Sequence, residues 1–316
     1  MTRLAAVDCG TNAIRLLISE HSGGKTRDIH RALEIVRLGE GVDATGRFSP
    51  TAIERTRAAL ERYVEIMRIE RVEKVRMVAT SATRDATNRD DFFAMTSDLL
   101  GRIQPGAVAE VITGEEEAAL SFAGAVADLP ADKGPFCVID LGGGSTEFVV
   151  GDADGTIHGS YSANMGCVRI TERIMRDDPA TDTEIEIARD YVHECLETVQ
   201  RTVDLARAKT FVGCAGTFTT ISAIAQGLET YEAAAIHGSV LRCDALMVLT
   251  NQLIAQTSDQ RAAHPVIHPG RADVLAGGSV VVQGIIGVAR DLAGVKEIVV
   301  SEKDILDGII AGLASS

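Results

Sequence analysis

Short apolar runs alternate with longer amphipathic stretches in the first half of the chain. Residues 4–18 (LAAVDCGTNAIRLLI) predict two strands joined by a small polar turn. Ser49 suits a helix N-cap and Pro50 suits the first helical position, so a helix is expected to begin there. Further strands are expected at 33–38, 75–79 and 108–112, and helices over 50–69, 89–102 and 113–127. Strands that alternate with helices predict an α/β sheet with functional side chains at strand ends.

The second half continues this alternation after a polar, proline-containing segment at 128–135, which predicts a linker. Helices are expected near 167–177, 183–208, after 217, and over 243–256 and 271–290; strands are expected at 210–212 and 297–300, before a final helix from about Asp304. The apolar stretch 274–289 is interrupted by glycines and Gln283, and it falls short of the roughly 18–20 clean residues of a membrane span. We therefore expect a buried core helix there.

One segment near the N-terminus returns in the middle of the chain, and this repeat is the strongest organisational signal. Residues 7–18 (VDCGTNAIRLLI) align with residues 139–150 (IDLGGGSTEFVV), Asp on Asp and Gly on Gly. Each copy reads as an apolar strand, a D-x-G turn and a second apolar strand. The repeat predicts two similar α/β domains that face each other across a cleft.

The two D-x-G turns are candidate phosphate-binding loops. Small residues leave consecutive backbone N–H groups open to an anion, and Gly142–Thr146 is the richer copy. Arg15 in the first copy occupies the place of Glu147 in the second. Asp140 and Glu147 are expected to hold a divalent cation, and Arg15 is expected to clamp a phosphate. The alternative is a salt bridge between Arg15 and Glu147 that joins the two domains.

Three consecutive glutamates begin a predicted helix and include a candidate base. Thr113 and Glu116 fit a capping box, whereas Glu117 points elsewhere and is a candidate general base. Arg84 follows a strand and suits bidentate phosphate binding, although an ordinary surface arginine fits equally well. Gly213–Thr217 is a third candidate loop, between a strand and a helix, with a plain tight turn as the alternative.

Composition limits the ligand classes. Of 316 residues, 45 are acidic and 31 are basic, and the net charge of −14 argues against nonspecific binding to nucleic acid or to an anionic membrane. The chain has no tryptophan, so it offers little surface for stacking bases. A polyanionic ligand would need a local cation to overcome the overall charge. Six scattered cysteines form no C-x-x-C pair and predict buried free thiols in a reducing cytosol.

Seven short motifs occur in succession along nearly the whole chain. They are residues 8–15 (DCGTNAIR), 79–86 (ATSATRDA), 113–118 (TGEEEA), 140–147 (DLGGGSTE), 165–169 (MGCVR), 213–217 (GCAGT) and 269–273 (PGRAD). In this combination the chain resembles the exopolyphosphatase/guanosine-pentaphosphate phosphohydrolase (Ppx/GppA) family, part of the superfamily of actin and the sugar kinases. The resemblance implies two actin-like (ribonuclease H-like) α/β domains: 1–128 plus about 303–316, and 129–302.

The resemblance also implies roles for individual residues. Glu117 matches the family's catalytic base, and Asp140 and Glu147, together with Asp8, match positions for Mg²⁺ or Mn²⁺. The implied phosphate-binding residues are Asn12, Arg15, Arg84, Gly143, Gly144, Ser145, Thr146, Gly216 and Thr217. A cytoplasmic location and a homodimer are expected, without a nucleic-acid or membrane partner.

The expected activity is that of an exopolyphosphatase, in which water attacks the terminal phosphoanhydride of inorganic polyphosphate in line, assisted by Mg²⁺. Short chains are the expected substrate, because longer family members carry extra C-terminal helical domains that this sequence does not contain. Three alternatives stay open. They are a pppGpp 5′-phosphohydrolase, a non-enzymatic (p)ppGpp-binding regulator of the stringent response, and a sugar or acetate kinase, which Glu117 and the chain length fit less well.

Overall fold

A computed structural model describes residues 1–315 and divides the chain into two compact units. Unit 1 comprises Met1–Leu120 with Ile305–Ser316, and unit 2 comprises Ser121–Asp304. The first division falls inside helix α5 (Gly114–Val126) rather than in the linker expected at 128–135. The helix continues past the division because its second half packs on the sheet of unit 2, where Phe122 lies against Gly151.

Unit 1 contains one five-stranded mixed sheet in the order β3-β2-β1-β4-β5. The strands are β1 (Thr2–Cys9), β2 (Ala13–Ser22), β3 (Lys25–Ile35), β4 (Lys74–Ala79) and β5 (Glu110–Val111). The first three form an antiparallel meander, whereas β4 and β5 run parallel to β1. Because Cys9 is paired with Ala79, the loops that follow β1 and β4 leave the same edge of the sheet.

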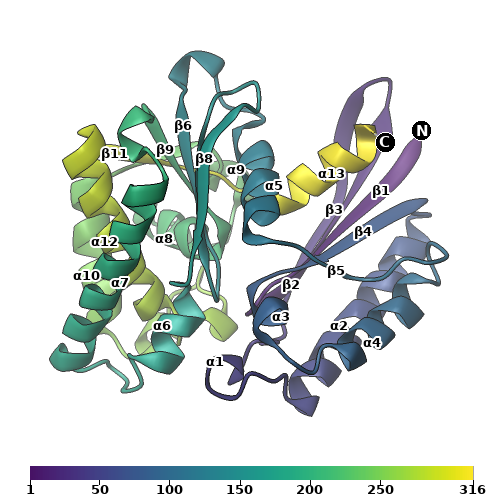
Figure 1. Ribbon diagram of the computed structural model, residues 1–316, viewed down its shortest axis with the longest axis horizontal. Helices are drawn as coiled ribbons and strands as arrows, with labels where there is room; N and C mark the ends of the chain where they lie inside the picture. Colours follow the sequence, from purple (N-terminus) through teal and green to yellow (C-terminus); the bar gives the residue numbers. More distant parts are fainter. Residues whose placement is uncertain (316) are drawn as a thin grey trace. The chain divides into compact units, whose positions relative to one another are not determined.

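Apolar layers cover both faces of the unit 1 sheet. Alternate residues of β1 face opposite ways, so Ala5 and Val7 join one core cluster while Leu4 and Ala6 join another. The first cluster contains α2 (Pro50–Ile69) and α4 (Asp90–Leu100), which lie side by side in Figure 1; the second contains α13 (Ile305–Ser315). Burial on both faces explains the nearly continuous apolar sequence of β1. Two short helices, α1 (Val42–Thr45) and α3 (Ser81–Asp85), complete the unit.

Unit 2 contains a six-stranded sheet in the order β10-β11-β9-β6-β7-β8. The strands are β6 (Phe136–Leu141), β7 (Thr146–Gly151), β8 (Ile157–Ala163), β9 (Thr210–Cys214), β10 (Ser239–Arg242) and β11 (Glu297–Val300). An antiparallel meander of β6, β7 and β8 is followed by parallel β9 and β11, as in unit 1. The shared 3-2-1-4-5 order is the ribonuclease H-like topology, so the predicted fold class is confirmed.

The helices of unit 2 enclose one large apolar core. They are α6 (Cys167–Arg173), α7 (Asp182–Thr202), α8 (Ala215–Ala225), α9 (Ala233–Ile236), α10 (Cys243–Ala255), α11 (Ser258–Ala262) and α12 (Leu275–Ala293), with 3-10 turns at Ala131–Lys133, Leu205–Arg207 and Pro269–Arg271. By length and composition α12 could cross a membrane, but 67% of its apolar window is buried. It packs against α6, α7 and α10, which confirms the predicted core helix.

The sequence located the central elements better than the edge strands. The helix expected over 50–69 is α2, and the Ser49 hydroxyl accepts a hydrogen bond from Ala52 N at 3.1 Å. In contrast, β3 begins at Lys25 rather than at 33, and both β8 and β10 were missed. Edge strands expose polar side chains to water, so a search for apolar periodicity misses part or all of such strands.

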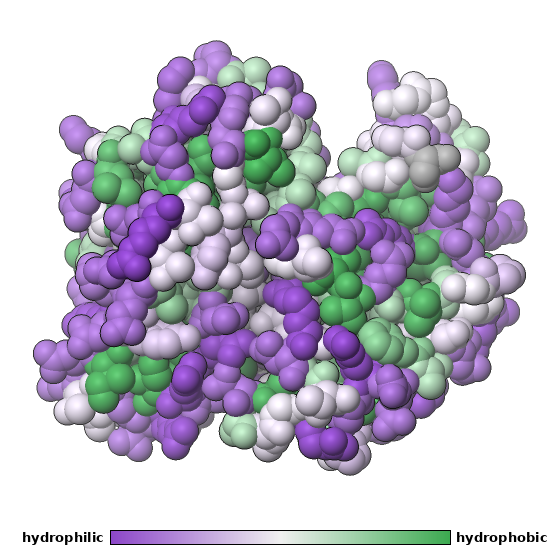
Figure 2. Space-filling view, in the orientation of Figure 1, coloured by the Kyte–Doolittle hydropathy of each residue, from purple (hydrophilic) through white to green (hydrophobic). Residues whose placement is uncertain are grey.

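The face drawn in Figure 2 is mostly hydrophilic, with small apolar patches between the polar side chains.

Candidate functional site

The turn between β1 and β2 carries the first set of candidate residues, in unit 1. A backbone hydrogen bond from Gly10 N to Ala13 O, 3.0 Å long, closes it. Asp8 and Arg15 are directly opposite each other on the two strands. Arg15 donates from Nε and Nη2 to Asp8 Oδ2 at 3.0 and 2.6 Å, and both side chains are largely shielded from solvent. The arginine of this copy therefore neutralises the aspartate of its own turn, while their phosphate and metal roles stay predictions.

The next two residues of this turn, Thr11 and Asn12, differ in their contacts within residues 1–315. Thr11 Oγ1 is buried and has no hydrogen-bond partner there. The Asn12 carbonyl accepts from the N–H groups of Val36 and Arg37 at 3.0 and 2.8 Å, which anchors the turn. A buried hydroxyl without a partner is uncommon in folded proteins and suits a loop that binds an anion. Sequence reasoning selected Asn12 but not Thr11.

The turn between β6 and β7 repeats this geometry in unit 2 with different charges. Gly142 N donates to Ser145 O at 3.0 Å, the counterpart of the bond in the first copy. Asp140 and Glu147 are directly opposite each other, and their residues are only 7% and 1% exposed. Like charges at directly opposed positions destabilise a sheet. A buried pair of carboxylates in this register therefore fits a divalent cation.

Each of these carboxylates accepts a hydrogen bond from a serine. Ser121 in α5 donates to Asp140 Oδ2 at 2.5 Å, and Ser162 in β8 donates to Glu147 Oε1 at 2.7 Å. Within residues 1–315 there is no group of three or more histidine, cysteine or acidic side chains placed to hold a metal. Two carboxylates nevertheless suit Mg²⁺, which keeps several waters and takes further ligands from substrate phosphates.

The glycine-rich loop after β6 is fastened to the start of α6. The Gly143 carbonyl accepts from Val168 N at 2.9 Å, and Arg169 Nε donates to Gly144 O at 2.8 Å. Glycine at position 166 lets this contact form, since a Cβ there would overlap the Gly143 backbone. With carbonyls bonded to α6, the loop has its N–H groups left to offer an anion.

Thr146 ends this loop, and its hydroxyl already has a structural partner. Thr146 Oγ1 donates to Met165 O at 2.6 Å, and the residue is fully buried. The predicted phosphate contact at this position would therefore use the backbone rather than the hydroxyl. The predicted contacts at Gly143, Gly144 and Ser145 are compatible with the loop as it stands.

In unit 1, α3 and α5 bring the candidate base together with a candidate phosphate ligand. Arg84, in the last turn of α3, donates from Nη1 to Glu117 Oε2 at 2.7 Å and to Ile112 O at 3.1 Å. The Arg84 side chain is 24% exposed and that of Glu117 is 11% exposed. An arginine paired with a nearly buried carboxylate is not an ordinary surface residue, which removes one of the two readings that the sequence left open for Arg84.

The other two glutamates of α5 have structural tasks. Glu116 N donates to Thr113 Oγ1 at 3.2 Å, as in a capping box, but the Glu116 carboxylate accepts from Arg76 at 2.6 Å. Hydrogen bonds from its own backbone and from Thr113 lower the pKa of the exposed Glu115 carboxyl. Of the three glutamates, Glu117 is the buried one, which supports its selection as the candidate base.

The third glycine turn leads from β9 into α8 in unit 2. Ala215 has a φ of 66°, a left-handed conformation that is unfavourable for alanine, so the turn stores strain of the kind found at functional sites. A Cβ at Gly216 would overlap the guanidinium of Arg271, so the 269–273 motif lies against this turn. Sequence reasoning assigned no role to Arg271, although its motif was one of the seven.

Two cysteines adjoin the candidate loops and remain protonated. Burial raises the pKa of the Cys167 thiol to about 11, although Arg271 and a hydrogen bond with Thr217 act in the opposite direction. Burial also raises the pKa of the Cys9 thiol, and the charge of Asp8 adds to that shift. The thiolate is the nucleophilic form of cysteine, so neither residue suits covalent catalysis.

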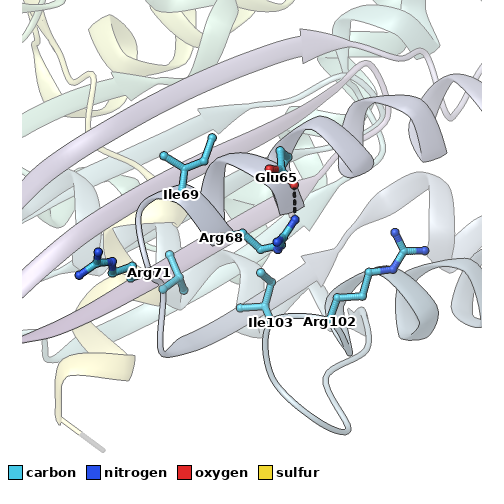
Figure 3. A pocket seen from close by; sticks show the side chains of 7 residues that line it. Glu65, Arg68, Ile69, Arg71, Arg102 and Ile103 are labelled. Atoms are coloured by element: carbon cyan, nitrogen blue, oxygen red, sulfur yellow. Dashed lines mark hydrogen bonds and ion pairs between the residues drawn. The ribbon is translucent and has the colours of Figure 1, made fainter.

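An open cavity of about 300 Å³ lies elsewhere in unit 1, at the C-terminal ends of α2 and α4. Figure 3 shows Arg68, Arg71 and Arg102 around it, with guanidinium groups that spread apart rather than converge. Arg68 is paired with Glu65 of its own helix, and Arg102, which follows α4, is paired with Asp98 of α4. The cavity adjoins the start of β4, whereas the β1–β2 turn and Arg84 of the same unit follow the ends of β1 and β4. The six residues of β4 place these ends roughly 20 Å from the cavity, at ~3.3 Å per residue. Cations at helix C-termini complement the helix dipole, so this cavity is not our candidate site.

The fold and these residues define a class of protein: duplicated ribonuclease H-like units, each with a D-x-G turn at the equivalent strand ends. Residues 17–313 match the Ppx/GppA phosphatase family. The chain therefore belongs to this family, and the resemblance expected from its motifs is confirmed.

Named relatives cover the whole chain. It is 54% identical to Exopolyphosphatase 2 of Mycobacterium tuberculosis over 318 residues, which covers 99% of both proteins. Its structure is similar to the crystal structure of an exopolyphosphatase-like protein, with a TM-score of 0.93, 37% identity and 99% coverage of both chains. It is also similar to the PPX-GPPA enzyme of Aquifex aeolicus, with a TM-score of 0.78, 29% identity and coverage of 100% of this chain and 99% of the other.

Proposed function

We propose that this protein is an exopolyphosphatase, which releases terminal orthophosphate from inorganic polyphosphate. The observation that carries the choice of substrate is the 54% identity, over 99% of both chains, with a protein named Exopolyphosphatase 2. Hydrolysis of pppGpp ranks second, because that relative is named for polyphosphate. A purely nucleotide-binding role ranks lower still, because a buried glutamate paired with an arginine and a buried carboxylate pair both serve catalysis.

Glu117 is the proposed general base. Its carboxylate orients the attacking water and accepts a proton from it as the oxygen approaches the terminal phosphorus. Arg84 holds Glu117 Oε2 in place and is itself suited to donate to a phosphate oxygen. In this proposal the guanidinium positions the base before the substrate arrives and stabilises the phosphate charge afterwards.

Asp140 and Glu147 are the proposed ligands of Mg²⁺ or Mn²⁺. A divalent ion held there would supply Lewis-acid stabilisation of the charge on the phosphate oxygens. The N–H groups of Gly143, Gly144 and Ser145 donate to phosphate oxygens from the neighbouring loop. Asp8 is a less direct candidate for a ligand, because its Oδ2 already accepts from Arg15.

A cytoplasmic location is part of the proposal. All six cysteines, which lie within residues 1–315, are free thiols, and five of them are buried. Free thiols of this kind persist in a reducing compartment. The homodimer and the preference for short chains stay predictions from the family.

The test is phosphate release from polyphosphates of several lengths and from pppGpp, with Mg²⁺ and with EDTA. We expect Mg²⁺-dependent release from polyphosphate, and Glu117→Gln should lower kcat by about 10²–10⁴-fold with an unchanged circular dichroism spectrum. Glu115→Gln is the matched control, since this exposed residue lies on the same helix and should leave the rate unchanged. Near-normal turnover by Glu117→Gln would reject Glu117 as the general base. Phosphate release from pppGpp alone would reject polyphosphate as the substrate.

A further inference from the structure

A row of polar side chains crosses one face of the unit 2 sheet. Asp140 on β6, Glu147 on β7 and Ser162 on β8 are directly opposite one another on successive strands. Directly opposed residues of antiparallel strands point to the same face. Ser121 of α5 adjoins the β6 end of this row through its bond to Asp140 Oδ2. The carboxylate pair is therefore flanked by one hydroxyl donor at each end.

The hydroxyl of Ser121 bonds outside its own helix, unlike several other buried helical hydroxyls of the chain. A buried serine or threonine inside a helix commonly donates to the backbone carbonyl four residues earlier. Three buried helical residues do so here, at 2.7–2.8 Å: Thr56, Thr250 and Ser279. Ser121 is equally buried, yet its hydroxyl donates to a side-chain carboxylate on a neighbouring strand.

A fixed donor on one carboxylate oxygen has a direct consequence for a bound cation. The bond to Oδ2 restricts rotation of the Asp140 carboxylate, so less freedom is lost when an ion binds. Hydrogen-bonded partners of metal ligands act in this way, and their loss typically weakens metal affinity. Ser162 acts in the same way on Glu147, from a less buried position.

We propose that Ser121 is a positioning residue of the cation site, which holds the Asp140 carboxylate ready for a divalent ion. This inference rests on the proposed function, because it takes Asp140 and Glu147 as the ligands of Mg²⁺. Ser121 also comes four residues after Glu117 in α5, and residues with this spacing lie on one face of a helix. One helix thus carries both the proposed base and the group that orients a proposed cation ligand.

The experiment measures Mn²⁺ binding to the full-length protein by electron paramagnetic resonance, without substrate. Ser121→Ala is expected to raise the dissociation constant for Mn²⁺ by about 10–100-fold. Ser279→Ala is the matched control, because it removes a buried helical hydroxyl that bonds only to a backbone carbonyl, and its Mn²⁺ affinity should equal that of the wild type. Asp140→Asn should abolish binding, and the Mg²⁺ concentration needed for half-maximal phosphate release should rise for Ser121→Ala.

The outcomes separate this inference from the proposed function. Unchanged Mn²⁺ affinity in Ser121→Ala, with binding lost in Asp140→Asn, overturns the role of Ser121 alone. Unchanged affinity in both variants overturns the cation site, and the inference with it. An equal loss in Ser279→Ala would reveal a general packing effect and also overturn the inference. Should Ser121→Ala fail to fold, Ser121→Cys supplies the measurement, since its thiol is similar in size but a poor donor.

Discussion

The two copies of the strand pair should respond in opposite ways when one charge is neutralised. In unit 2 the opposed residues are Asp140 and Glu147, which carry like charges. In unit 1 the equivalent residues are Asp8 and Arg15, which form an ion pair. Glu147→Gln is therefore expected to stabilise the metal-free protein, whereas Arg15→Gln is expected to destabilise it.

The magnitude follows from the register. Directly opposed side chains place two charges ~5 Å apart, and at an effective dielectric constant of ~20 their repulsion is about 3 kcal/mol. Glutamine keeps the volume of Glu147 and can still accept a bond from Ser162, so the free energy of unfolding should rise by about 1–3 kcal/mol. Arg15→Gln removes the guanidinium from a nearly buried Asp8 carboxylate and should lower that free energy by about 1–3 kcal/mol.

Urea unfolding in EDTA, repeated with Mg²⁺, measures both effects. The wild type should gain stability from Mg²⁺ by mass action, and Glu147→Gln should gain little because one proposed ligand oxygen is neutralised. Phosphate release by Glu147→Gln should be lost although the protein is more stable. The reasoning fails if Glu147→Gln is destabilised in EDTA as much as Arg15→Gln, or if Mg²⁺ stabilises it as strongly as the wild type.

Three further outcomes are expected. Gly216→Ala should change the free energy of unfolding by less than about 1 kcal/mol, because the flexible Arg271 side chain can move and alanine favours the helix. The same variant should nevertheless lower kcat/KM for phosphate release by up to about 10²-fold. Gly166→Ala should lower the free energy of unfolding, measured in urea, by about 1–3 kcal/mol, because its Cβ would meet the Gly143 backbone. Equal stability of Gly166→Ala and Gly216→Ala would contradict this expected difference. Ellman's reagent should label Cys195 at most in the native protein, since the other five cysteines are buried, and all six in urea; rapid native labelling of several thiols would disprove it.

The sequence predicted the central parts of both units because their chemistry is local. An apolar strand, a D-x-G turn and a second apolar strand form a hairpin from their own residues, and the turn bonds at Gly10 and Gly142 have the same length in both copies. The same pattern identified Asp140 as a candidate, whereas Glu117 was identified from the run of three glutamates that begins a predicted helix. It could not locate β8 or the start of β3, because edge strands lack the continuous apolar runs that burial on both faces requires.

The sequence by itself therefore determined the duplicated hairpins, the α/β class and the residue types available for phosphate chemistry. Only the tertiary structure decided which of these residues meet. It paired Arg84 with Glu117 across two helices, and it directed Ser121 to Asp140 rather than to its own helix. The physical reason is that hydrophobic periodicity specifies which face a side chain occupies, whereas strand register and helix packing over long sequence separations specify its neighbour.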